Sequence, residues 1–303
     1  MQIFLSILSR TKIKFYNNDI RTSPATELSD VCDGAVYRKL ARTQRDSFIT
    51  LTLNIDGISI FQSSNRSIWI FTAAINEIAR QDRLKLNNML ILAISSSLCK
   101  PSKAQMQSML KPIVQNLKRI ENGISFSTPD QAAVWGRVFL ILSCNDKPAQ
   151  ALLQNLGEPH GRFGCGDKVS TGKTTIRVFP TAPTITYSLR TNEWYDQMIE
   201  TVCKPDVRQR TTEDEILEML CGHKGFCRLR DLSNFDIGQS FANDPLHNVY
   251  HGVFRRILVP LFDDKYAKQK WSCKNKMESI QASLDKIHYP SNTTRIPRPL
   301  IFF

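Results

Sequence analysis

Two aspartates carry the clearest chemical signal in this sequence. Asp56 lies within the segment 51–61 (LTLNIDGISIF), where apolar and polar residues alternate with the period of a half-buried strand. Asp146 follows the apolar run 138–143. An acidic group on a strand costs free energy unless something binds it, and a divalent cation is the usual binder. Two carboxylates on neighbouring strands would suit the two-metal chemistry of nucleotidyl transfer.

The segment around Asp56 also supports other interpretations. Asp56-Gly57 between two apolar runs is a strong signal for a β-hairpin turn, in which both residues would occupy the turn. A strand aspartate whose carboxylate is bound by neighbouring protein groups is equally compatible with the local sequence. The order of the surrounding elements favours a metal ligand over both alternatives.

Those surrounding elements follow from hydrophobic periodicity. Apolar residues three and four apart predict a helix over 104–122, closed by Gly123, and Gly157 is expected to end a second, shorter helix. The predicted elements, in chain order, are strands at 48–62, 67–75 and 89–96, the helix at 104–122, a strand at 137–144 and a helix at 148–156. This is the order of a ribonuclease H-like domain, in which one acid lies on the first strand and another just after the fourth. Asp56 and Asp146 occupy those two places, so we expect an α/β fold with a mixed sheet and helices.

The rest of the chain divides by composition. Prolines and clustered Gly and Thr predict an irregular insertion over 158–240. Helices are expected from His247 to Leu261, stopped near Pro260, and over 274–287. The predicted organisation is a lead-in at 1–46, the first part of the ribonuclease H-like domain at 47–157, the insertion at 158–240 and a C-terminal helical part at 241–303.

Charge and cysteine content limit the classes of function. The formal charge of +12 and the pI of about 9.4 suit a partner made of phosphates. No apolar run approaches the roughly 20 residues that span a bilayer, which argues against a membrane partner. The 8 cysteines form no CxxC pair, which favours reduced thiols. We therefore expect a protein of the nucleus or cytoplasm that is not secreted.

A series of motifs resembles the transposases of CACTA-type (En/Spm-like) DNA transposons. The similarity covers about residues 30–300, in order. The motifs are LTLNIDGISIFQSS at 51–64, Trp69 leading to INE at 75–77, LKP at 110–112, DKPA at 146–149, LQN at 153–155, GRFGC at 161–165, GHKG at 222–225, FDI at 235–237, DPLH at 244–247, GV at 252–253 and RIPRPL at 295–300.

The resemblance implies a DDE/D-type catalytic domain that cuts and joins DNA with Mg²⁺ or Mn²⁺. Asp56 would be the first acid and Asp146 the second, both as metal ligands, and Asp244-x-x-His247 would be the D-x-x-H element of such enzymes. Two carboxylates, water and phosphate oxygens complete an octahedral shell. One metal would activate the attacking hydroxyl and the other would stabilise the departing oxygen. The implied partners are transposon-end DNA and another copy, this chain or a full-length transposase.

Two departures from the family pattern qualify these expectations. Cys165 lacks the second cysteine of a CxxC arrangement, so zinc is not expected; Cys221, His223 and Cys227 are a weaker alternative set. The family's third acid is a Glu beyond the Arg-Pro-Arg stretch, and the sequence ends at Phe303 before it. We therefore expect a truncated transposase with impaired catalysis. The alternative is a transposon-derived protein that binds DNA or another protein and cuts nothing.

Overall fold

The computed structural model divides the chain into two compact units, Met1–Asn243 and Asp244–Phe303, and each is described by itself. The described residues are 1–15, 30–59, 66–97, 99–157, 167–170, 175–178, 191–204, 212, 215–216, 220–243 and 254–287.

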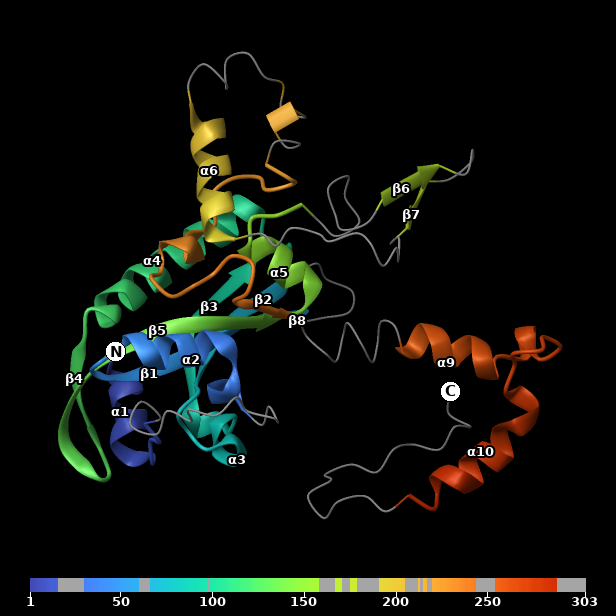
Figure 1. The fold of residues 1–303 in the computed structure, drawn as a ribbon, viewed down its shortest axis with the longest axis horizontal. Coiled ribbons are helices and arrows are strands. Elements are labelled where there is room, and N and C mark those ends of the chain that lie inside the picture. Colours follow the sequence, from blue (N-terminus) through green and yellow to red (C-terminus); the bar gives the residue numbers. More distant parts are fainter. Residues whose placement is uncertain are drawn as a thin grey trace. The chain divides into compact units, whose positions relative to one another are not determined.

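A mixed sheet forms the centre of the first unit, in the order β3-β2-β1-β5-β4 with β8 beside the end of β5 (Figure 1). The strands are β1 (Ser47–Ser59), β2 (Ser67–Ile75), β3 (Met89–Ser97), β4 (Ile124–Thr128), β5 (Gln131–Asn145) and β8 (Phe241–Asn243). The first three strands are antiparallel neighbours, and β5 runs parallel to β1. The short β4 pairs with β5 as an antiparallel hairpin, and β8 pairs with β5 in parallel. The expected α/β class with a mixed sheet is thus confirmed.

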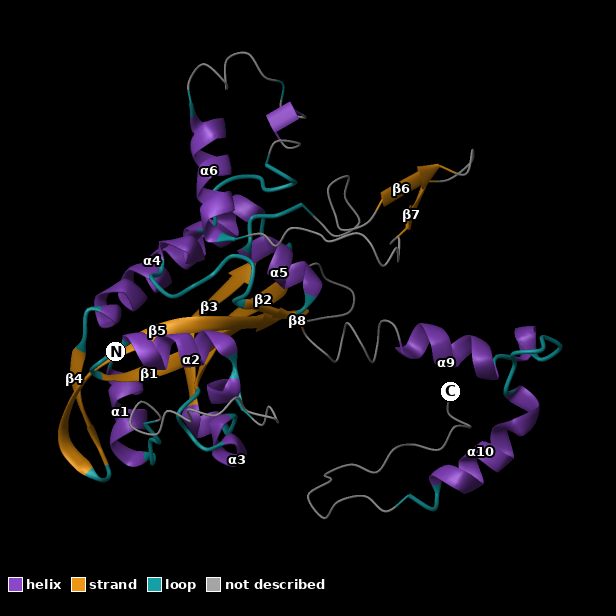
Figure 2. Cartoon of the chain, in the orientation of Figure 1, coloured by secondary structure: helices purple, strands orange, loops and turns teal. Residues whose placement is uncertain are grey.

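Helices surround this sheet in the first unit, and the described part of the second unit is also helical (Figure 2). The first unit holds α1 (Gln2–Arg10), α2 (Ala35–Thr43), α3 (Arg80–Arg83), α4 (Lys103–Glu121), α5 (Lys147–Leu153) and α6 (Asn192–Cys203). The hairpin of β6 (Asp167–Ser170) and β7 (Thr175–Val178) forms a separate two-stranded sheet. The second unit holds α9 (Arg255–Phe262) and α10 (Met277–Leu284).

The two faces of β1 are covered differently. Leu51, Leu53 and Ile55 are buried in the main core with residues of α1 and α4. On the opposite face, Phe48 packs in a smaller core with Tyr37 and other residues of α2. Further along β1, Asn54 and Asp56, which point to the α2 side by the period of the strand, are exposed. The strand face that carries Asp56 is therefore exposed to solvent, whereas the opposite face of the same strand segment is buried.

The strongly periodic elements were predicted well. The strands expected at 48–62, 67–75 and 89–96 correspond to β1, β2 and β3, and the helix expected at 104–122 is α4. Ser102 and Gln105 form a reciprocal cap at the start of α4. Gly123 follows the helix with φ +107°, and a Cβ there would lie 2.3 Å from Cζ2 of Trp135. Glycine is thus required at this helix end.

Several boundaries differ from the expectations. Helix α5 ends at Leu153, and Asn155, with φ 53°, makes the turn that was assigned to Gly157. The helix expected to end at Leu261, near Pro260, is α9, which ends at Phe262, and its expected start at His247 lies outside the described residues. Helix α2 and strand β4 were not predicted. The segment 158–240, expected to be irregular, contains α6 and buried core residues such as Leu229 and Phe235.

Candidate functional site

Asp56 lies in the interior of a regular strand. It pairs with Ile70 on β2, and Gly57 pairs with Trp69. The hairpin interpretation is therefore wrong, because both residues continue the ladder without a turn. The glycine is explained by the indole of Trp69, since a Cβ on Gly57 would lie 2.8 Å from Cε2 of that ring. The Asp56 side chain is exposed to solvent.

Asp146 lies immediately after β5 and caps helix α5. Its carboxylate accepts a hydrogen bond of 2.8 Å from the backbone N–H of Ala149. An aspartate at this position satisfies one of the unpaired N–H groups of the first turn and is stabilised by the helix dipole. One oxygen of Asp146 thus has a structural role, and the side chain remains partly exposed.

Parallel pairing brings the segments that carry the two aspartates together. The ladder between β1 and β5 ends at the pair of Leu53 and Ser143. Beyond it, Nδ2 of Asn54 donates to the carbonyl of Cys144 at 2.6 Å. The residues that precede the two aspartates are also joined: the N–H of Ile55 donates to Oδ1 of Asn145 at 2.7 Å. Asp56 and Asp146 therefore lie at the same end of adjacent strands.

The third strand at this end leads toward the D-x-x-H element. Asn243, the last residue of β8, pairs with Asn145 of β5. Asp244 follows Asn243 directly in the sequence, but Asp244 and His247 lie outside the described residues. The described part of the site thus consists of Asp56, Asp146 and the strand ends beside them.

Asn54 and Asn145 are site residues that sequence reasoning missed. Asn145 is 2% exposed, and its Nδ2 donates to Oγ of Ser143 at 2.7 Å while its Oδ1 accepts from Ile55. A buried amide bound on both sides fixes the spacing of the two strands. The available signal was an asparagine at the end of an apolar strand, where β-propensity disfavours it.

The donor atoms of the site are carboxylate oxygens. Within the described ranges, no group of three or more His, Cys, Asp or Glu side chains is placed to hold a metal ion. The carboxylates of Asp56 and Asp146 are hard oxygen donors of the kind that Mg²⁺ or Mn²⁺ prefers. They match the implied cation in donor type.

The alternative zinc set has an unsuitable thiol. Cys227 is buried, and its Sγ donates to the carbonyl of Leu153 at 3.1 Å. Burial raises the pKa of this thiol to about 12, which disfavours the thiolate that zinc requires. His223 is also buried, with Nδ1 3.2 Å from the carbonyl of Gln154, whereas Cys221 is exposed. Cys165 lies outside the described residues.

A third acid, Glu77, follows β2 and lies beside the opposite end of β1 in a closed environment. Its carboxylate accepts hydrogen bonds from the N–H of Thr50 at 2.9 Å, the hydroxyl of Thr50 at 2.8 Å and the hydroxyl of Tyr37 at 3.1 Å. Burial raises the pKa of the Glu77 carboxyl to about 7, although these hydrogen bonds act in the opposite direction. The group links β1 to helix α2.

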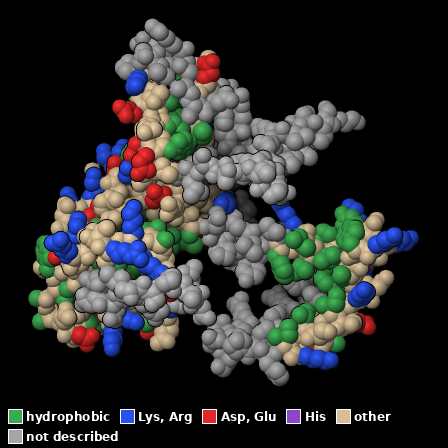
Figure 3. Space-filling view, viewed as in Figure 1, with side chains coloured by type: hydrophobic (Ala, Val, Ile, Leu, Met, Phe, Trp, Pro, Cys, Tyr) green, Lys and Arg blue, Asp and Glu red, His purple; other side chains and the backbone are tan. Residues whose placement is uncertain are grey.

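The basic pair Arg228 and Arg230 is partly neutralised by acids. Arg230 forms an ion pair with Asp196 at 2.6 Å, and Arg228 lies 3.9 Å from Asp231. Elsewhere, Lys and Arg side chains are spread over the visible face of the first unit (Figure 3). The basic residues at 208–210 and beyond 287 lie outside the described residues.

Comparisons with known proteins add no assignment. The chain matches no protein-family model, and no curated protein is significantly similar to it. In the part of the chain that the structure describes, no helix has both the length and the apolar character needed to cross a bilayer.

Proposed function

We propose that this chain is related to the DDE/D-type DNA transposases of CACTA-type transposons and uses Asp56 and Asp146 to hold a divalent cation. The observation that carries the proposal is the hydrogen bond between the N–H of Ile55 and Oδ1 of Asn145. It joins the residues that precede the two aspartates and keeps both carboxylates at one end of two parallel strands.

The order of strands supports a ribonuclease H-like fold for this chain. Such a domain has three antiparallel strands followed by two strands parallel to the first, in the spatial order 3-2-1-4-5. The strands β3-β2-β1-β5-β8 have this order and these directions, with α4 between β3 and β5 in sequence. The hairpin strand β4 is an addition to that arrangement.

The chemistry expected of the site is the displacement of one phosphodiester oxygen by another. A bound Mg²⁺ or Mn²⁺ would neutralise charge on the phosphate and favour deprotonation of the attacking hydroxyl. Asp56 and Asp146 would hold this cation. Asp244 and His247 remain part of the proposal as the D-x-x-H element, on the strength of the sequence resemblance alone.

The test is nicking of supercoiled plasmid DNA in Mg²⁺ or Mn²⁺ by the full chain and by single variants. We expect Asp56→Asn and Asp146→Asn to lower the rate by at least about 100-fold, as for other catalytic ligands. Asparagine is an equally good helix cap, so Asp146→Asn removes the charge and keeps α5 intact. Asp130→Asn, in the exposed turn between β4 and β5, is the matched control and should cut at the original rate.

A non-catalytic, transposon-derived DNA-binding protein is the second candidate. The observation that favours it is the cap bond from Ala149 to Asp146, which gives the second acid a structural function. In that case the folded chain would bind DNA and nick none in either metal. Binding would also survive the replacement of both Asp56 and Asp146 by alanine.

A further inference from the structure

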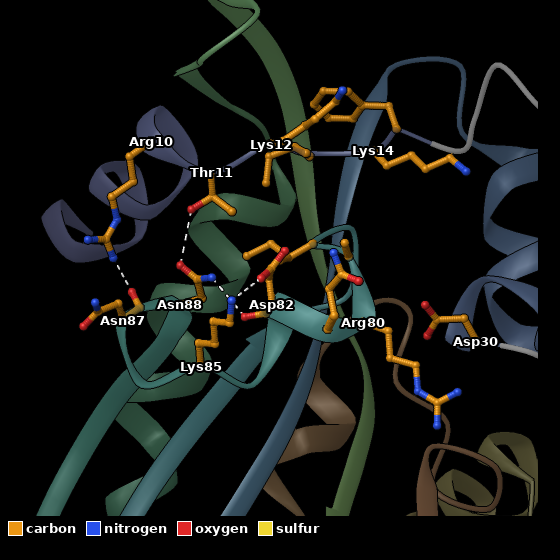
Figure 4. Close-up of a pocket in the computed structure, with 15 residues that line it drawn as sticks. Arg10, Thr11, Lys12, Lys14, Asp30, Arg80, Asp82, Lys85, Asn87 and Asn88 are labelled. Atoms are coloured by element: carbon orange, nitrogen blue, oxygen red, sulfur yellow. Dashed lines mark hydrogen bonds and ion pairs between the residues drawn. The ribbon is translucent and has the colours of Figure 1, made fainter. Parts of the chain in front are cut away.

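A large basic pocket lies at the end of the sheet opposite to Asp56. It has a volume of about 1120 Å³ and lies between the segment 10–15, which follows α1, and the segment 78–88, which includes α3 (Figure 4). Thr50, which contacts Glu77 next to this pocket, is six residues from Asp56 along β1. That separation corresponds to about 20 Å, so the pocket is distinct from the aspartate site.

The walls of the pocket are held together by hydrogen bonds. The N–H of Lys14 donates to the carbonyl of Glu77 at 3.0 Å, and Ile13 pairs with Ile78 as in an antiparallel sheet. Across the pocket, Oγ1 of Thr11 donates to Oδ1 of Asn88 at 3.3 Å. The guanidinium of Arg10 donates to the carbonyl of Asn87 (Figure 4). The lining is therefore fixed by the fold before any ligand binds.

The lining has an excess of positive charge. Its cationic side chains are Arg10, Lys12, Lys14, Arg80 and Lys85, against two carboxylates. Both carboxylates are neutralised by basic partners. Asp82 is 2.5 Å from Lys85, and both oxygens of Asp30 accept hydrogen bonds from Arg83, at 2.6 and 2.7 Å. An anionic ligand would thus meet a positive field and little repulsion.

The charge of the pocket indicates an anionic ligand. Eleven of the fifteen lining residues are polar or charged, and five of them are basic. Basic side chains along a groove are typical of sites that follow a nucleic-acid backbone.

We infer that this pocket binds the phosphate backbone of DNA through Lys12, Lys14 and Arg80. The inference rests on the proposed function for the identity of the polyanion, whereas the charge and the geometry are independent of it. The pocket lies about 20 Å from Asp56, so it would hold the same DNA at a second point, away from the bond to be cut. Contacts of this type position a duplex and do not read its sequence.

The test is equilibrium binding of a fluorescent DNA duplex to the full chain in EDTA, measured by anisotropy over a series of salt concentrations. The pocket variant is Lys12→Gln/Lys14→Gln/Arg80→Gln, in which all three replaced side chains are exposed. We expect at least a tenfold loss of affinity at about 0.1 M salt. The slope of log K against log salt should fall by about 2 to 3, as expected for three lost phosphate contacts.

The matched control is Lys111→Gln/Lys118→Gln/Arg119→Gln on the exposed side of α4, which removes the same charge. It should bind within about twofold of the original chain. An equal loss in both triple variants, or no loss in the pocket variant, would overturn the inference. So would micromolar binding of ATP that disappears in the pocket variant while its DNA affinity is unchanged.

One further variant and the absence of metal separate this test from folding and from cleavage. Lys12→Gln alone should lower the slope by about 1, which tests the pocket if the triple variant does not fold. The assay contains no metal, so its result does not depend on strand cleavage. Loss of binding in the pocket variant of a chain that never nicks DNA would support the pocket and contradict only the catalytic proposal.

Discussion

Two acids at opposite ends of β1 have opposite environments. Glu77 is 1% exposed and accepts hydrogen bonds from Thr50 and Tyr37. Asp56 projects from the open part of the sheet and is exposed. From the sequence alone, a role was expected only for Asp56. The structure assigns Glu77 to the link between β1 and α2 and leaves Asp56 accessible to a ligand.

The difference shows how burial separates a structural acid from a candidate catalytic acid. A carboxyl that must satisfy several buried donors is restricted by them, and removing it leaves those donors without an acceptor. An exposed carboxylate in a regular strand, by contrast, has little effect on stability. The predictions below test this distinction, beginning with the largest effect.

Glu77→Ala should destabilise the protein by about 3 kcal/mol, because buried donors of Thr50 and Tyr37 would lose their acceptor and a cavity would form. Chemical denaturation at pH 6 measures the change. Glu77→Gln retains an acceptor oxygen, so its free energy of unfolding should fall clearly less. Equal stability of Glu77→Ala and the original chain would show that the acid is not the link between β1 and α2.

The free energy of unfolding should depend on pH through the titration of Glu77. Its pKa is raised from 4.5 to about 7 on folding, so the folded state binds more protons in this interval. The stabilisation from the protonated carboxyl is complete below pH 4.5 and is lost as the pH rises through 7. The total change is about 3 kcal/mol at most. Denaturation curves from pH 4.5 to 8 should show this decline, and Glu77→Gln should remove it.

Gly57→Ala should destabilise the protein by about 1–3 kcal/mol, the usual range for overpacking. The added methyl would meet the indole of Trp69 at 2.8 Å, so the ring or the strand must shift. Thermal unfolding measures the effect, and Trp69 fluorescence reports the shift of the ring. Gly157→Ala is a control, since the nearest atom to its Cβ is 3.5 Å away. A neutral Gly57→Ala would indicate that Asp56-Gly57 is not held in the ladder with β2.

Asp56→Asn should change stability by no more than about 0.5 kcal/mol, because the side chain is exposed. Denaturation midpoints of this variant and of Asp130→Asn should coincide with that of the original chain. A large destabilisation would mean that the Asp56 carboxylate has a structural partner, as Glu77 does. The contrast between the two acids would then disappear.

Hydrophobic periodicity determined much of the fold. Strands β1, β2 and β3 and helix α4 lie where the patterns of two and of three to four residues placed them. The sequence also placed Asp56 on the first strand and Asp146 after the strand that follows α4. These results depend on local rules, in which each side chain selects a face of its own element.

Only the tertiary structure decided which acids are accessible and which strands are adjacent. The short strand β8 has three residues, too few for a periodic signal, and pairs with β5 through contacts distant in sequence. The link from Asn145 to Ile55 spans 90 residues of sequence. The burial of Glu77 depends on α2, more than 30 residues away. Such contacts form when separate elements pack, and no local pattern specifies them.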